Sequence, residues 1–266
     1  MTFMIGGFAD FNNKGGGDWG ENLLNTVASN TIRHLFTQSE SVDVAVRCNP
    51  SSKLLQGSID SFKMSGRGLV IRRDFRTEEM SFETDAVSLD FGSVLKGKIT
   101  LKQPTQAIAL VKLTEKDLNH SFKAELVRKR LENISSPALS QLSGGEAVSF
   151  TDVDLELLPH NRVKMSAQAH LPNGTIPVSL SSTLAVAKRR QIRFKDAQFE
   201  AEGIPEEKQS TSRLLSESLA EILNNMVDLD RFNLDGVTLR INRLETQGKN
   251  LLFSGYAQIE RIPKTG

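Results

Sequence analysis

The sequence has almost no cysteine. Cys48 is the only cysteine among 266 residues, so no intrachain disulfide is possible and the chain does not need an oxidising compartment to fold. A single thiol cannot complete a zinc site without several histidines, and the four histidines (His34, His120, His160 and His170) show no metal-ligand spacing. We therefore predict no metal, and we interpret Cys48 as a small side chain on a strand.

Long hydrophobic runs are also missing. No segment approaches the roughly 18 consecutive apolar residues that a membrane-spanning helix needs. The first ten residues, MTFMIGGFAD, have no basic region, and Gly6 and Gly7 interrupt their apolar stretch, so they do not resemble a secretory signal. We expect a cytoplasmic protein that meets a membrane only peripherally, at its cytoplasmic face.

The chain has no excess of charge of either sign. Lys and Arg number 33 and Asp and Glu number 32, which gives a formal net charge of +1. A neutral chain has no overall attraction for phosphate groups. With one Trp and one Tyr, it also has few aromatic platforms on which bases could stack. We expect no nucleic-acid partner.

Catalytic motifs are absent as well. The sequence contains no G-x-S-x-G, no H-E-x-x-H, no phosphate-binding loop and no G-x-G-x-x-G after a strand. The Gly15–Gly17 run follows no strand and lacks the Lys-Ser/Thr pair of a phosphate loop. We therefore predict no catalytic residue, no cofactor and no enzymatic activity.

Amphipathic patterning is what the sequence does have. Residues 1–20 are rich in Gly and Asn and are predicted to form a flexible tail. Residues 21–266 are predicted to form a single α+β domain with two sub-halves, about 21–134 and 146–262, joined by a loop at about 135–145. Three helices are expected, over 21–37, 114–134 and 208–228, and Leu215, Leu219, Ile222 and Met226 make one apolar stripe on the third.

Period-two alternation fills the rest of the chain and predicts half-buried antiparallel strands. The expected strands lie between residues 41 and 111, and at 148–158, 162–170, 176–186, 191–201, 236–246 and 250–261. Strands of about ten residues are roughly 33 Å long, close to the roughly 30 Å of a helix of about twenty residues. Matching lengths favour a long, curved antiparallel sheet wrapped around helices, with an elongated apolar interior that is either filled or open to a ligand.

One short motif occurs twice, forty residues apart. Residues 54–59 read LLQGSI and residues 94–99 read VLKGKI, which share an apolar residue, Leu, Gly and Ile at matching places. We interpret the glycines, Gly57 and Gly97, as either ending a short helical turn or starting a strand, at a position where a positive φ is needed.

A family resemblance rests on these motifs and on Leu113-Thr114-Glu115-Lys116-Asp117-Leu118-Asn119. Together with Val87-x-Leu89-Asp90 they make the chain similar to the bacterial LmeA-like phospholipid-binding family. The resemblance implies a tubular lipid-binding, BPI-like fold, in which a curved sheet encloses a hydrophobic groove for phospholipid. It carries no catalytic residues over to this chain. We interpret Thr114 with Asp117 as a capping box at a helix start.

The resemblance directs attention to apolar residues on the helices and strands. The predicted lipid contacts are Leu215, Leu219, Ile222, Met226, Phe82, Leu89 and Phe91. The predicted patch for lipid head groups or a membrane surface, taken from two basic loop clusters, is Arg72, Arg73, Lys188, Arg189 and Arg190.

Two other classes of function share these patterns. The first is a structural or adaptor protein with a fully packed interior that binds an unidentified protein partner. The second is an enzyme acting on lipid, with Asp90, His120 or His170 in a polar cluster inside the cavity. A continuous apolar groove open to solvent separates the lipid-binding protein from the adaptor.

Overall fold

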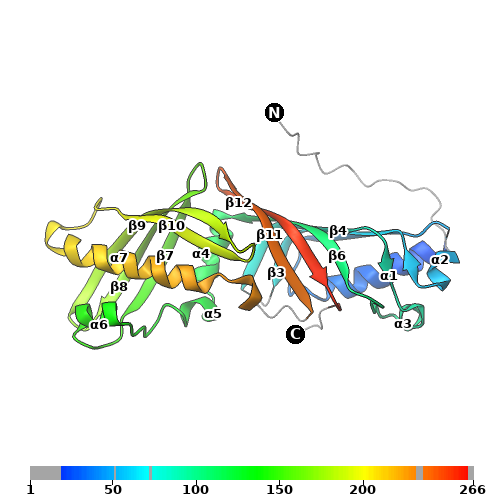
Figure 1. Cartoon of the computed structure of the whole chain (residues 1–266), viewed down its shortest axis with the longest axis horizontal. Coiled ribbons are helices and arrows are strands. Elements are labelled where there is room, and N and C mark those ends of the chain that lie inside the picture. Colours follow the sequence, from blue (N-terminus) through cyan, green and yellow to red (C-terminus); the bar gives the residue numbers. More distant parts are fainter. Residues whose placement is uncertain (1–18, 51, 72–73, 232–235, 263–266) are drawn as a thin grey trace.

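The computed structural model describes residues 19–50, 52–71, 74–231 and 236–262. The molecule is elongated, and two antiparallel sheets follow one another along its long axis, each with one long helix packed beside it (Figure 1). The predicted α+β class is confirmed. The strands form two separate large sheets, whereas the sequence favoured a single curved one. The predicted tail, residues 1–20, falls outside the described residues except for Trp19 and Gly20, which begin the first helix.

The larger sheet has the order β1-β3-β4-β6-β12-β11 and is antiparallel throughout. Its last two strands come from the end of the chain, so the sheets do not follow the expected sub-halves 21–134 and 146–262. Helix α1 (Trp19–Arg33) packs on β1 at one edge. The strand bounds are β1 Ser41–Arg47, β3 Ser61–Ile71, β4 Phe75–Thr84, β6 Thr105–Thr114, β11 Val237–Gln247 and β12 Asn250–Ile259.

The smaller sheet has the order β10-β9-β8-β7. Helix α7 (Glu206–Met226) lies along β9 and β10 (Figure 1). Asn224 fastens its last turn, because its side chain accepts a hydrogen bond from the Phe194 N–H (2.7 Å) and donates one to the Phe194 carbonyl (3.2 Å). The strand bounds are β7 Ser149–Leu157, β8 Arg162–Leu171, β9 Gly174–Ala187 and β10 Gln191–Phe199.

The helix expected over 114–134 is interrupted. It forms α4 (Glu115–Phe122) and a short α5 (Glu125–Arg128), because the backbone of the buried Ala124 turns extended between them. The loop expected at 135–145 holds another helix, α6 (Pro137–Ser143). Ser136 caps its start, Pro137 opens its first turn and Gly144 ends it at φ +71°, which is a recognisable local signal for a helix.

The repeated motif forms two matching short helices, α2 (Ser52–Leu55) and α3 (Phe91–Leu95). Gly57 and Gly97 follow them with φ of +78° and +73°, so the predicted role of these glycines is confirmed. Strand β2 (Ser58–Ile59) pairs with β5 (Val87–Ser88) beside these helices. The strand expected to continue through Phe91 ends early because Asp90 caps α3.

Two turns of the smaller sheet hold the edge strand β11. In the turn between β7 and β8, the Asn161 side chain bonds the Thr246 N–H (2.8 Å) and the Leu244 carbonyl (3.1 Å). In the turn between β9 and β10, the carbonyl of Arg189 accepts a hydrogen bond from the Ile241 N–H (2.6 Å). The 3-10 turn η1 (Leu229–Arg231) links α7 to the stretch before β11. Among the residues described, no helix is long and apolar enough to cross a bilayer.

Candidate functional site

One face of the six-stranded sheet, here called the inner face, is apolar from edge to edge. Its strand register aligns three rows of side chains, and only Thr84 among the eighteen residues is polar. The rows are Val44, Met64, Phe82, Ala109, Gly255 and Ile241; Val46, Phe62, Thr84, Ala107, Ala257 and Leu239; and Val42, Gly66, Met80, Val111, Phe253 and Leu244.

The inner face joins the apolar clusters of the two halves. Phe82 and Met80 pack against a middle cluster of Val42, Met64 and Leu69. At the other end of the same rows, Ile241 and Leu244 belong to the large cluster that also contains the smaller sheet and α7. Apolar side chains therefore extend without a break along both halves of the molecule.

The inner face is not fully covered by the described residues. Phe62, Met80, Phe82, Val111 and Phe253 are only partly buried, although large apolar side chains in a protein interior are usually buried completely. The centre of the face, on β6 and β12, carries small residues, of which Ala107, Ala109 and Ala257 are buried and Gly255 is half-buried. The apolar surface that stays exposed on this face is therefore that of the large side chains beside this strip of small residues.

Three of the predicted lipid contacts lie in the N-terminal half, at two places. Phe82 is on the inner face and partly buried. Leu89, which is 3% exposed, and the partly buried Phe91 belong to a separate cluster around α2 and α3. The structure therefore does not bring these three side chains into one group.

The other four predicted contacts lie on α7. Leu215 and Leu219 have no exposed surface and form the centre of the C-terminal core with Leu223. Ile222 and Met226, nearer the end of the helix, are partly exposed. In this half the stripe packs against side chains of β9 and β10.

The predicted basic patch is divided, and two of its three described residues make internal contacts. Arg190 is ion-paired with Asp228 (3.0 Å) and Asp230 (2.9 Å). The guanidinium of Arg189 bonds the Asn242 side chain and lies 5.0 Å from the ring centre of Tyr256. These contacts fasten the β9–β10 turn to β11 and β12. Lys188 is exposed in the same turn, and Arg72 and Arg73 lie outside the described residues.

Three polar residues of the family motif at 113–119, Glu115, Asp117 and Asn119, tie α4 to other elements. The Thr114 hydroxyl accepts from the Asp117 N–H, and Asp117 bonds the Thr114 N–H in return, so the predicted capping box is confirmed. Glu115 accepts from the Leu157 N–H (2.7 Å). The Asn119 side chain bonds both the N–H and the carbonyl of Leu155 (2.7 and 3.0 Å). The motif therefore joins the two sheets through β7.

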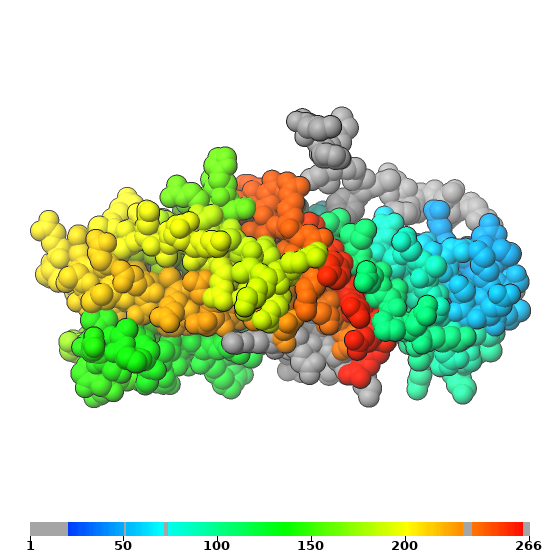
Figure 2. Space-filling view, in the orientation of Figure 1, coloured from blue at the N-terminus to red at the C-terminus, as the bar shows by residue number. Residues whose placement is uncertain are grey.

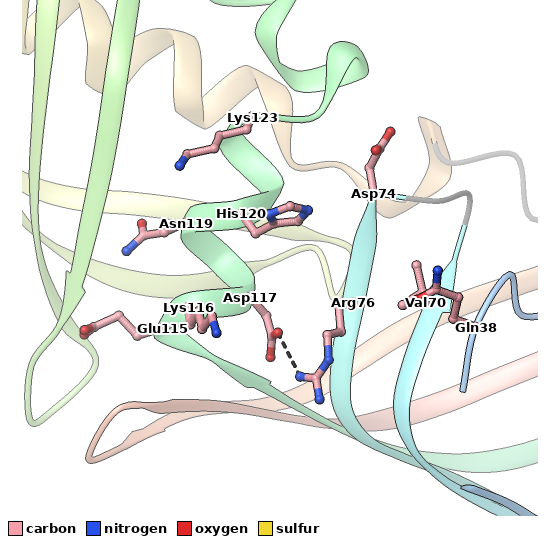
Figure 3. Close-up of a pocket in the computed structure, with 10 residues that line it drawn as sticks. All are labelled: Gln38, Val70, Asp74, Arg76, Glu115, Lys116, Asp117, Asn119, His120 and Lys123. Carbon is pink, nitrogen blue, oxygen red and sulfur yellow. Dashed lines mark hydrogen bonds and ion pairs between the residues drawn. The ribbon is translucent and has the colours of Figure 1, made fainter. Parts of the chain in front are cut away.

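A polar cavity of about 630 Å³ lies between α4 and the β3–β4 end of the larger sheet (Figure 3). Arg76 reaches from β4 to the start of α4, where it meets the Asp117 carboxylate at 2.9 Å. Glu40 (2.8 Å) and Glu78 (2.9 Å) bind the same guanidinium. The three carboxylates raise the pKa of Arg76 and so keep the guanidinium charged. Because all of its ion pairs are internal, we interpret this cluster as a structural joint.

Asp117 is the most deeply buried carboxylate of the joint, with its side chain 5% exposed. Burial acts to raise the pKa of Asp117, but hydrogen bonds from Thr114 and Arg76 outweigh burial and hold that pKa below its ordinary value. A carboxyl group whose pKa is lower in the folded state stabilises the fold above its unfolded pKa, about 3.9, and this contribution is lost as the pH falls.

We accordingly expect the joint to weaken in acid. The free energy of unfolding should fall from about pH 5 downward, and Asp117→Asn should reduce that fall because the titrating group is gone. Urea unfolding at a series of pH values measures both slopes. Parallel curves for the two proteins would show that Asp117 does not contribute to the acid sensitivity.

The three residues considered for an enzymatic role do not form a cluster with one another. Asp90 caps α3, His170 bonds Thr151 (2.7 Å) and Thr175 (3.2 Å), and His120 lines the polar cavity. Within the described part of the chain, no group of three or more His, Cys, Asp or Glu is placed to hold a metal ion.

Sequence reasoning missed the inner face as a unit, and it missed the partners of Arg76. Alternation along each strand marks which side chains share a face, but the alignment of rows depends on register across five strand pairs. Arg76 and Asp117 are 41 residues apart, and no local pattern links them.

The model of a family described as LmeA-like phospholipid-binding matches residues 15–255, which is nearly the whole chain. The chain has no match among curated proteins.

Proposed function

The chain belongs to the LmeA-like phospholipid-binding family, and from this we propose that it holds the acyl chains of a phospholipid against the inner face of the six-stranded sheet. The family supports lipid binding as the general activity. The finer proposal, that the lipid is carried to or from the cytoplasmic face of a membrane without chemical change, agrees with the absence of catalytic motifs in the sequence.

The observation that carries the proposal is the partly exposed apolar inner face. An acyl chain that lies against this face removes apolar surface of both the lipid and the protein from water, which contributes roughly 0.8 kcal/mol per buried CH₂. Several methylene groups along the half-buried side chains of Met80, Phe82, Val111 and Phe253 are enough for stable binding, and no specific polar group is required.

The predicted contacts fit this proposal to different degrees. Phe82 borders the strip, since it pairs across the strands with Ala109, and it can meet a lipid without rearrangement. Phe91, Ile222 and Met226 are partly exposed but pack against clusters at the two ends of the molecule. Leu89, Leu215 and Leu219 are buried in packed clusters, so a lipid reaches them only if the surrounding side chains move.

Phe82→Asp tests the proposal. A carboxylate beside the strip should lower phospholipid binding at least about tenfold, because it must lose water to make room for an acyl chain. Native mass spectrometry of the purified protein, followed by lipid extraction, measures the bound lipid and identifies its head group. Ala109→Leu, which adds bulk next to Phe82 without adding charge, should also lower the bound lipid, and urea unfolding checks that both variants are folded.

Leu110→Asp is the matched control. Leu110 follows Ala109 on β6, points to the opposite face of the sheet and is 51% exposed. This variant should therefore bind lipid as the unmodified protein does. Equal lipid content in all four proteins would overturn the inner face as the site. A lipid-free protein that takes up none from liposomes would instead favour the adaptor with a packed interior.

A further inference from the structure

Two exposed leucines stand at equivalent places in the repeated motif. In each copy the first apolar residue, Leu54 or Val94, is 1% exposed and packs in the cluster shared by α2 and α3. The following leucine points the other way: Leu55 is 64% exposed and Leu95 is 61% exposed. The motif therefore presents the same apolar side chain to solvent twice.

Both leucines belong to one end of the molecule, here called the tip, made of residues 52–60 and 87–102. Helices α2 and α3 lie together at the end of the long axis beyond the larger sheet (Figure 1), where they form part of the outer surface (Figure 2). The pairing of β2 with β5 and a hydrogen bond from the Leu89 N–H to the Gly57 carbonyl (2.7 Å) hold them side by side. These backbone hydrogen bonds therefore fix the positions of the two helices that carry the leucines.

The charges around the leucines are mostly positive. The tip contains four lysines, Lys53, Lys96, Lys98 and Lys102, and two acidic residues, Asp60 and Asp90. Both carboxylates are occupied: Asp60 pairs with Lys53 (2.6 Å) and Asp90 caps α3 through Gly92 and Ser93. Lys96, Lys98 and Lys102 are exposed, and none of the three has an ion-pair partner within the described residues.

We propose that the tip docks the protein on an anionic bilayer, with Leu55 and Leu95 inserted among the acyl chains and the lysines at the head groups. Exposed leucines gain from leaving water, and lysines near an anionic surface add an attraction that salt weakens. A protein partner would be expected to cover a continuous apolar patch, whereas two separate leucines ringed by lysines suit a lipid surface. The proposal goes beyond lipid binding on the inner face and does not require it.

Flotation with vesicles of phosphatidylcholine and phosphatidylserine tests the proposal. The double variant Leu55→Ser/Leu95→Ser should bind these vesicles about a hundredfold more weakly, since removing each leucine side chain from the bilayer costs about a factor of ten. Binding of the unmodified protein should fall with added salt, and it should be weaker on vesicles of phosphatidylcholine alone.

Ile108→Ser/Leu110→Ser is the control, because it removes two leucine-sized side chains of similar exposure, 65% and 51%, from the outer face of the sheet. It should bind vesicles like the unmodified protein. Equal binding by the tip variant, or equal loss in both variants, would overturn the docking site. Lipid content measured on the same samples separates the two proposals, because the tip variant should retain its bound lipid if the inner face holds it.

Discussion

Leu219→Asp is expected to prevent the C-terminal half from folding. Leu219 has no exposed surface and packs with Leu215 and Leu223 against β9 and β10. A carboxylate at that position would lose its water without gaining a partner, at an effective cost of several kcal/mol. This is comparable to the whole stability of a typical domain, about 5–15 kcal/mol. Circular dichroism and limited proteolysis should show a disordered C-terminal half.

Leu219→Ala makes the effect measurable in a folded protein. Truncating a fully buried leucine costs about 3–5 kcal/mol, which urea unfolding resolves. Leu214→Asp is the control, because Leu214 is on the same helix and 46% exposed, and it should leave stability nearly unchanged. Leu219→Asp should also abolish lipid binding. If it changes neither stability nor binding, the packing described for α7 is wrong.

The second large effect is expected at the joint between α4 and β4. Arg76→Met leaves the Asp117 carboxylate buried without its cation, and removing one partner of a buried pair typically costs 3–5 kcal/mol. The Arg76 side chain is 30% exposed, so water reaches the pair and we expect about 3 kcal/mol, the lower end of that range. Urea unfolding at neutral pH measures the loss.

Two further variants identify the cause of that loss. Arg67→Met removes a guanidinium that is 64% exposed and pairs with Glu79 at 3.3 Å, so it should cost less than about 1 kcal/mol. Adding Asp117→Asn to Arg76→Met should restore part of the stability, because the unpaired buried charge is then gone while the amide oxygen can still accept the hydrogen bond from the Thr114 N–H. Equal losses for Arg67→Met and Arg76→Met would contradict the structural role of the joint.

The parts of the fold that sequence alone could predict are those with local causes. The capping box at Thr114 and Asp117 needs only residues three apart, and the glycines of the repeated motif require a positive φ for the backbone of their own turn. The alternation over 148–201 likewise marked the four strands of the smaller sheet to within a few residues. Such signals depend on periodicity and capping, which neighbouring residues fix.

The parts that sequence alone could not predict depend on distant partners. Nothing in the sequence near Asn250 indicates that β12 pairs with β6, because the strands of the smaller sheet are closer to β12 along the chain. The basic run at Lys188–Arg190 has the composition of a head-group patch, but Asp228, Asp230 and Asn242 engage two of its three cations from elsewhere in the chain. Of the candidate site, Phe82 could be identified from its strand, whereas its neighbours on the inner face follow from the register of six strands.

The sheet order also sets a sequence of events during synthesis. Strands β7 to β10 and α7 are contiguous in the chain, so this half can close while the ribosome is still adding residues. The larger sheet cannot close then, because β6 gains its second neighbour only when β12, residues 250–259, has emerged. Until then β6 offers an open row of backbone hydrogen-bonding groups to any other nascent strand. The emergence of residues 250–259 therefore decides when the exposed edge of β6 is protected from aggregation.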